Sequence, residues 1–110
     1  MIRLDLREPA RAHSPAIEVR DELCDAAIAT WLGRMTNEYQ SSFVFEALAT
    51  QLEACPSLAV HAAEARSFAA EERRHGILCG AVVEALGGKA VTAVEDQPDF
   101  PAHAEVDLEE

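Results

Sequence analysis

Pro56 divides the chain into two long stretches that contain no further proline and have helical spacing of their apolar residues. The first stretch runs from residue 16 to about residue 54, and the second from residue 57 to about residue 86. Proline lacks a backbone N–H and clashes with the preceding turn, so no helix passes through Cys55-Pro56-Ser57 undisturbed. Long helices joined by so short a connection must lie antiparallel, and the sequence therefore predicts a helical hairpin.

Local signals give the expected limits of this hairpin, residues 15–88. Ser14 and Pro15 are a helix start signal, because serine caps a helix and proline suits its first position. The glycine pair at 87–88 is typical of a helix end. Within the first stretch the expected point of a break is Gly33, since an interior glycine costs about 1 kcal/mol relative to alanine.

Composition favours an all-α fold. Of the 110 residues, 49% are hydrophobic, with many alanines and leucines, and only 5% are aromatic. A chain of this size buries only about two thirds of its unfolded surface. Because a lone hairpin leaves an apolar stripe on each helix open to water, we expect a homodimer or higher homo-oligomer that builds a four-helix bundle.

The segments outside the hairpin are expected to be an N-terminal arm, residues 1–14, and an acidic tail, residues 89–110. The arm alternates apolar and charged residues before Pro9, a pattern compatible with a short extended segment; its apolar members are Ile2, Leu4 and Leu6. Residues 95–110 contain seven acidic residues and no lysine or arginine. This part of the tail has too little apolar content to fold alone.

The net charge and the cysteines indicate which binding partners and which cellular compartment to expect. A formal net charge of -11 would repel a phosphate backbone, so nucleic-acid binding is not expected. No segment has the roughly 20 apolar residues of a membrane span, and the first residues lack a signal-peptide core, which predicts a cytoplasmic protein. Three widely spaced cysteines, Cys24, Cys55 and Cys79, indicate reduced thiols rather than disulfides or a zinc knuckle.

Three polar residues interrupt the apolar stripes of the two helices. On the second helix the stripe is apolar except at Glu72 and His75; its other members are Leu58, Ala62, Ala65, Phe68, Cys79, Val82 and Leu86. On the first helix, Glu38 interrupts the stripe that contains Trp31 and Phe45. Glu38 precedes Pro56 by 18 residues and Glu72 follows it by 16, so both stand at nearly the same height above the turn. These side chains can therefore share one metal site.

A glutamate followed 34 residues later by Glu-x-x-His resembles the first helical hairpin of the ferritin-like superfamily, over about residues 28–88. In those proteins such a hairpin supplies half of a di-iron site. The resemblance implies that Glu38 is a terminal carboxylate ligand, that Glu72 bridges the metals and that His75 is a nitrogen ligand. It also implies oxidation of Fe(II) by O2 or peroxide, as in a ferroxidase or a peroxidase-like enzyme.

The chain departs from that family in having no second hairpin and no second Glu-x-x-His. Either two chains pair to rebuild the bundle, with two irons per dimer, or the chain is the N-terminal half of a longer protein. Carboxylate and imidazole ligands also accept manganese or zinc. A rival hypothesis is a non-enzymatic dimerisation module in which the polar layer of Glu38, Glu72 and His75 only gives specificity.

Overall fold

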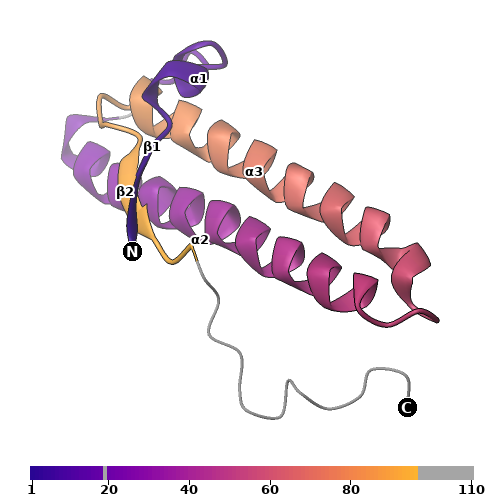
Figure 1. The fold of residues 1–110 in the computed structure, drawn as a ribbon. Coiled ribbons are helices and arrows are strands. Elements are labelled where there is room, and N and C mark those ends of the chain that lie inside the picture. Colours follow the sequence, from indigo (N-terminus) through magenta and orange to yellow (C-terminus); the bar gives the residue numbers. More distant parts are fainter. Residues whose placement is uncertain (19, 97–110) are drawn as a thin grey trace.

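The computed structural model describes residues 1–18 and 20–96, and it is mostly helical. Two long helices, α2 (Asp21–Glu53) and α3 (Ala62–Ala85), lie side by side and antiparallel (Figure 1). A short connection containing the 3-10 turn η1 (Ala59–His61) joins them. The helical hairpin and the reversal at Pro56 are thus confirmed, although the second α-helix begins later than residue 57.

The predicted helix start at Ser14 and Pro15 is wrong, because α2 begins at Asp21. The Ser14 hydroxyl does not cap a helix; it donates to the backbone carbonyls of Ala10 at 3.2 Å and Ala81 at 3.5 Å. Arg20 has extended backbone angles, and the acidic residues that favour a helix N-terminus come directly after it. Ser14 therefore links two segments that are far apart in the chain, around Ala10 and around Ala81.

Gly33 does not interrupt α2, which is continuous over 33 residues. Its position is exposed, and a Cβ built there would meet nothing within 4 Å. Packing of α2 along α3 outweighs the roughly 1 kcal/mol cost of one interior glycine. The predicted helix end at the glycine pair is confirmed: Gly87 has a φ of +92°, and the Gly88 N–H donates to the Val83 carbonyl at 2.9 Å.

A two-stranded antiparallel sheet joins the two segments that were expected to lie outside the hairpin. Strand β1 (Ile2–Asp5) pairs with β2 (Val91–Val94), with Ile2 opposite Val94. The sheet therefore connects the predicted arm, residues 1–14, with the first part of the predicted tail, residues 89–110. The acidic residues from 97 onward lie outside the described residues, so the expectation for them stays a prediction.

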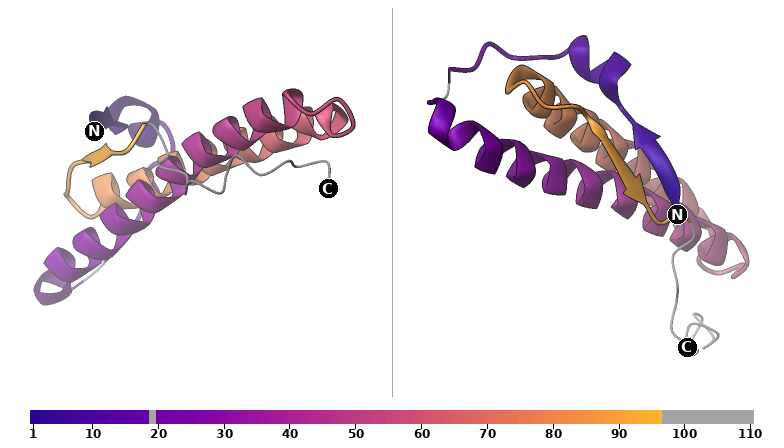
Figure 2. Two further views of the ribbon diagram at one scale, coloured as in Figure 1. Left: turned by 60° about the horizontal axis from the view of Figure 1, so that its bottom comes forward. Right: turned by 90° about the vertical axis from the view of Figure 1, so that its left-hand side faces the viewer.

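The sheet and the short helix α1 (Arg7–Arg11) cover one side of the hairpin at the end away from the turn (Figure 2). The main core lies beneath them and contains Leu4, Leu6, Ala10, Met35, Ala81, Ala90 and Val94. A second, smaller core near the turn contains Ala49, Ala62 and Ala65. The candidate site lies between these two cores along the hairpin.

Candidate metal centre

Gly76 allows α2 and α3 to approach closely at the level of the predicted ligands. A Cβ added to Gly76 would lie 3.1 Å from both Cβ and Cδ2 of Tyr39, closer than ordinary van der Waals contact. Tyr39 follows Glu38 in α2, and Gly76 follows His75 in α3. The missing side chain therefore brings these two predicted ligands together from different helices.

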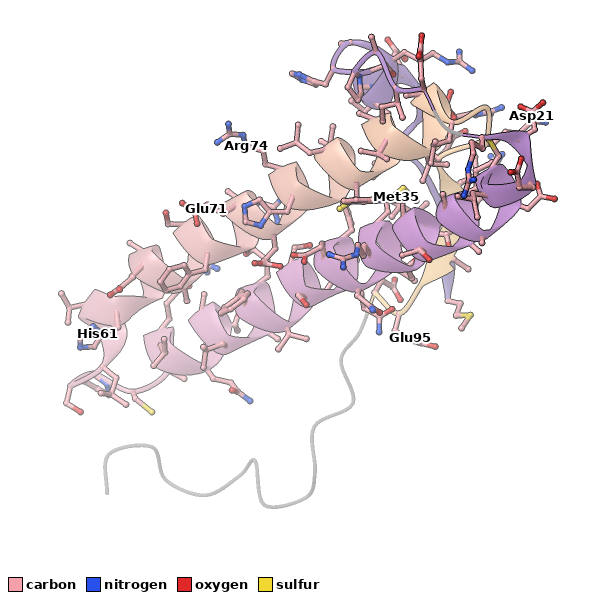
Figure 3. The ribbon with its side chains drawn as sticks, turned by 180° about the vertical axis from the view of Figure 1, so that it is seen from behind. Asp21, Met35, His61, Glu71, Arg74 and Glu95 are labelled. Carbon is pink, nitrogen blue, oxygen red and sulfur yellow. The ribbon has the colours of Figure 1, made fainter. Side chains whose placement is uncertain are left out.

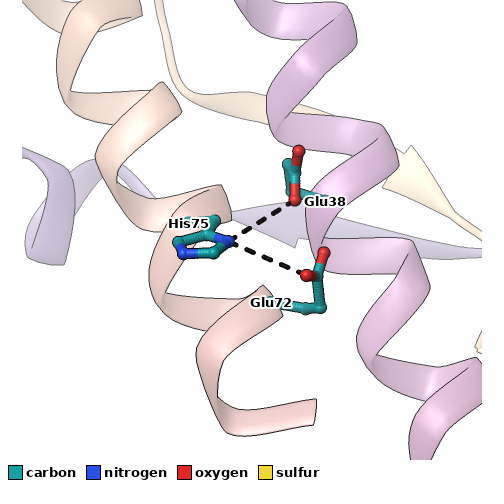
Figure 4. A group of neighbouring side chains, drawn as sticks. All are labelled: Glu38, Glu72 and His75. Atoms are coloured by element: carbon teal, nitrogen blue, oxygen red, sulfur yellow. Dashed lines mark ion pairs between the residues drawn. The ribbon is translucent and has the colours of Figure 1, made fainter. Parts of the chain in front are cut away.

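The structure places Glu38, Glu72 and His75 in one group, as the sequence predicts (Figure 4). Their ligand atoms all lie within 4.8 Å of one another. The Nδ1 atom of His75 is 3.7 Å from Oε2 of Glu38 and 3.7 Å from Oε1 of Glu72. Among the described residues, no other group of His, Cys, Asp and Glu side chains meets in this way.

The two distances of 3.7 Å from His75 to the glutamates suit a divalent cation. A metal about 2.1 Å from each of two ligand atoms holds those atoms roughly 3 to 4 Å apart. Two carboxylates and one imidazole, without a thiolate, are ligands that Fe(II), Mn(II) and Zn(II) accept. One chain contributes three ligand residues, so further coordination positions remain for a second chain, water or an oxidant.

The group lies at the edge of the helix–helix contact rather than inside it. The His75 side chain is 51% exposed and the Glu38 side chain 40%, whereas Glu72 is 23% exposed. The residues of α3 that face α2 are instead small: Ala62, Ala65, Ala69, Gly76 and Gly80. Because these small residues form the contact, Phe68, Glu72 and His75 of the predicted stripe lie along its rim, whereas Ala62 and Ala65 of that stripe belong to the contact.

Two groups at the centre have shifted pKa values. A hydrogen bond between the Glu72 and Glu38 carboxyl groups, followed by burial and the charge of Glu38, raises the pKa of Glu72. Burial, followed by the charge of Glu38, raises the pKa of the Cys79 thiol. Cys79 therefore stays a neutral thiol at pH 7, one turn beyond His75.

Around the group, the two helices present a surface that we call the open face. It consists of the side chains that helical spacing along α2 and α3 places on the same side as the candidate ligands: Ala27, Trp31, Arg34, Glu38, Phe45, Leu48, Phe68, Glu72, His75 and Cys79. Two aromatic contacts help to define it. Phe45 and Phe68 join the helices, with ring centroids 5.6 Å apart, and the Arg34 guanidinium lies 5.1 Å from the Trp31 ring.

Other polar residues of the hairpin lie away from the ligands. Glu71 and Arg74 project from α3 away from α2 (Figure 3), and both are exposed. Arg66 forms ion pairs with Glu46, at 3.2 Å, and with Glu53, so it links the two helices near the turn. The ion pairs of Arg66 support the hairpin, and none of these residues belongs to the ligand group.

Sequence reasoning missed two contributors to the site. Gly76 was not singled out, although glycine beside a ligand histidine is itself a signal of close helix approach. Arg34 was also missed; its spacing of three residues from Trp31 and four from Glu38 is the helical spacing at which side chains meet.

Comparisons of the chain with family models, with curated proteins and with solved structures find no match. Within the described part of the chain, no helix is both long and apolar enough to cross a membrane. The site must therefore be interpreted from its own geometry and chemistry.

Proposed function

We propose that two copies of the chain join their Glu38, Glu72 and His75 side chains into a dinuclear iron centre that oxidises Fe(II). The observation that carries this proposal is the convergence of the three ligand residues within 4.8 Å on an exposed face. A two-fold operation on this group provides four carboxylates and two imidazoles, the ligand set of the di-iron bundles that the sequence resembles.

The chemistry of the ligands fits this reaction. Two Fe(II) ions release two electrons, which with two protons reduce O2 to hydrogen peroxide, or reduce hydrogen peroxide to two waters. Carboxylates favour the ferric product because their negative charge stabilises the added positive charge. Glu38 and Glu72 hold the cations, and His75 supplies the neutral nitrogen ligand.

The main test removes one ligand group at a time, and for the two glutamates the change to glutamine keeps the side-chain shape. Glu38→Gln, Glu72→Gln and His75→Ala should each lower Fe(II) affinity at least about tenfold, since even indirect ligand partners are worth that much. Each should also abolish O2-dependent Fe(II) oxidation. Iron per chain and the ferric absorbance after addition of Fe(II) measure both effects.

Asp25→Asn is the matched control, because it removes an exposed carboxylate from the same helix as Glu38 but away from the group. It should behave like the parent. If the parent binds no transition metal at micromolar concentration, or the ligand variants bind iron as the parent does, the site assignment is wrong.

The exposed apolar residues around the group favour a second hypothesis, the dimerisation module without redox chemistry. Phe68 is 44% exposed and Leu48 is 36% exposed, both on the open face. Metal-free protein that forms a dimer as tightly as metal-loaded protein, with no Fe(II) oxidation, would establish this alternative.

A further inference from the structure

The open face has an apolar groove on the turn side of the candidate metal centre. The groove has a volume of about 190 Å3 and is lined by Phe45, Leu48, Leu52, His61, Glu64, Ala65 and Phe68. Phe45 lies seven residues after Glu38, and Phe68 lies four residues before Glu72. With a rise of about 1.5 Å per residue, both rings stand roughly 6 to 10 Å from the centre toward the turn.

On the other side of the centre, the open face carries an indole. Trp31 precedes Glu38 by seven residues, so it stands about 10 Å from the centre in the direction away from the turn. It is partly exposed, and Arg34 stacks on its ring. The near edge of the groove, at Phe45 and Phe68, and the indole thus lie at similar distances from the centre in opposite directions.

A two-fold axis that joins two open faces through the metal ligands has two principal directions. An axis parallel to the helices leaves the position of every residue along the helix direction unchanged. The groove of one chain then faces the groove of the other, and Trp31 faces Trp31. An axis perpendicular to the helices and lying between the two faces reverses the direction of the helices. A residue above the centre in one chain then faces a residue below it in the other, so each Trp31 faces the groove of the other chain. Only the second direction fills both grooves with an apolar side chain of suitable size.

We propose that the second copy docks antiparallel on the open face, with the Trp31 side chain of each chain in the Phe45–Phe68 groove of the other. In this arrangement α2 faces α2 of the other copy. Indole, phenyl rings and leucines then surround the ligands on both sides, and the metal is shielded from water. The proposal rests on the proposed two-chain centre, because that centre fixes where the two-fold axis passes.

The environment of Trp31 provides the first test, because it is the only tryptophan of the chain. Zn(II), which is neither paramagnetic nor redox-active, serves as the probe metal. Adding Zn(II) to the metal-free protein should shift Trp31 emission to the blue as the dimer forms. The double variant Phe45→Ala/Phe68→Ala should lose most of this shift, whereas Leu78→Ala, an exposed leucine outside the groove, should keep it.

Disulfide formation between chains tests the antiparallel orientation of the dimer independently of Trp31 emission. Arg34 and Ser41 lie four residues before and three residues after Glu38, so the antiparallel arrangement places Arg34 of one chain opposite Ser41 of the other. Mixing an Arg34→Cys chain with a Ser41→Cys chain, both with Cys79→Ala, should give the 34–41 heterodimer under mild oxidation. Peptide mass spectrometry separates it from products of Cys24 and Cys55.

The outcomes separate the docking proposal from the proposed function. A zinc-dependent dimer that shows neither the emission shift nor the 34–41 link contradicts the antiparallel docking and leaves the metal centre intact. A 34–41 link in protein that binds no metal supports the docking and contradicts the proposed function. A protein that stays monomeric with zinc bound contradicts both.

Discussion

At the scale of single residues, the centre depends on a position where a side chain is missing. Gly76→Ala would put a methyl group 3.1 Å from Tyr39, and the helices must separate slightly to accept it. We expect a loss of about 1–3 kcal/mol in the free energy of unfolding, as for other overpacked sites. Metal affinity should fall as well, because Glu38 and His75 flank the contact. Chemical denaturation and metal titration measure the two effects.

Gly33→Ala is the matched control for this prediction. It makes the same change in an α-helix interior where a Cβ meets nothing within 4 Å. It should raise the free energy of unfolding by about 0.5–1 kcal/mol through helix propensity and leave metal affinity unchanged. Equal stabilisation by both substitutions would show that Gly76 is not needed for close approach of the helices.

At the scale of elements, the sheet is part of the core. Ala90 and Val94 are 0% exposed, and both belong to the same core as Leu4 of β1. A chain that ends at Gly88 loses both buried residues and uncovers the first strand. We expect it to be less stable than the parent by at least about 2 kcal/mol, since burial of one valine is worth 1.5–3 kcal/mol.

A chain that ends at Asp96 keeps β2 and is the control for the truncation at Gly88. Its thermal midpoint, followed by circular dichroism at 222 nm, should match that of the full chain. If the chain ending at Gly88 unfolds at the same temperature as the chain ending at Asp96, the sheet contributes no stability.

The elements also show what the sequence can and cannot predict. The helical hairpin was predictable because Pro56 and the helical spacing are local signals. The pairing of β1 with β2 was not, because it joins residues 2 and 94, which are far apart in the chain, and each strand has only 4 residues. The helix start was misplaced because Ser14 has a tertiary use that its local signal does not show.

The members of the candidate site were predictable, whereas the residues of α3 that pack against α2 were not. Once the helical hairpin forms, spacings of three and 34 residues are enough to bring Glu38, Glu72 and His75 together. However, α3 has two adjacent sets of residues at helical spacing, one containing Phe68 and the other Ala69, and both have the period expected of a packed helix face. Close packing selected the smaller side chains for the contact with α2, and periodicity alone does not reveal that choice.

At the scale of the whole molecule, assembly should depend on metal. Each chain has a formal net charge of -11, and docking brings the Glu38 and Glu72 carboxylates of two chains together. Without cations these carboxylates repel one another. We expect sedimentation velocity at micromolar concentration to report mainly monomer with a chelator and dimer with Fe(II) or Zn(II).

Charge variants and salt test the cause of this metal dependence. Glu72→Gln should dimerise more readily than the parent in the presence of a chelator, because it removes one repelling charge from each chain. High salt should act in the same direction by screening. A parent that binds metal stoichiometrically and remains monomeric would contradict the prediction.

The pairing of Ile2 with Val94 also sets an order of events in folding. The hairpin closes through contacts across one short turn, whereas the sheet must close a loop of nearly the whole described chain, which is entropically slower. During synthesis β1 is made first and has no partner until β2 follows. The ligands of the candidate centre therefore come together in the hairpin early, and the sheet completes the core last.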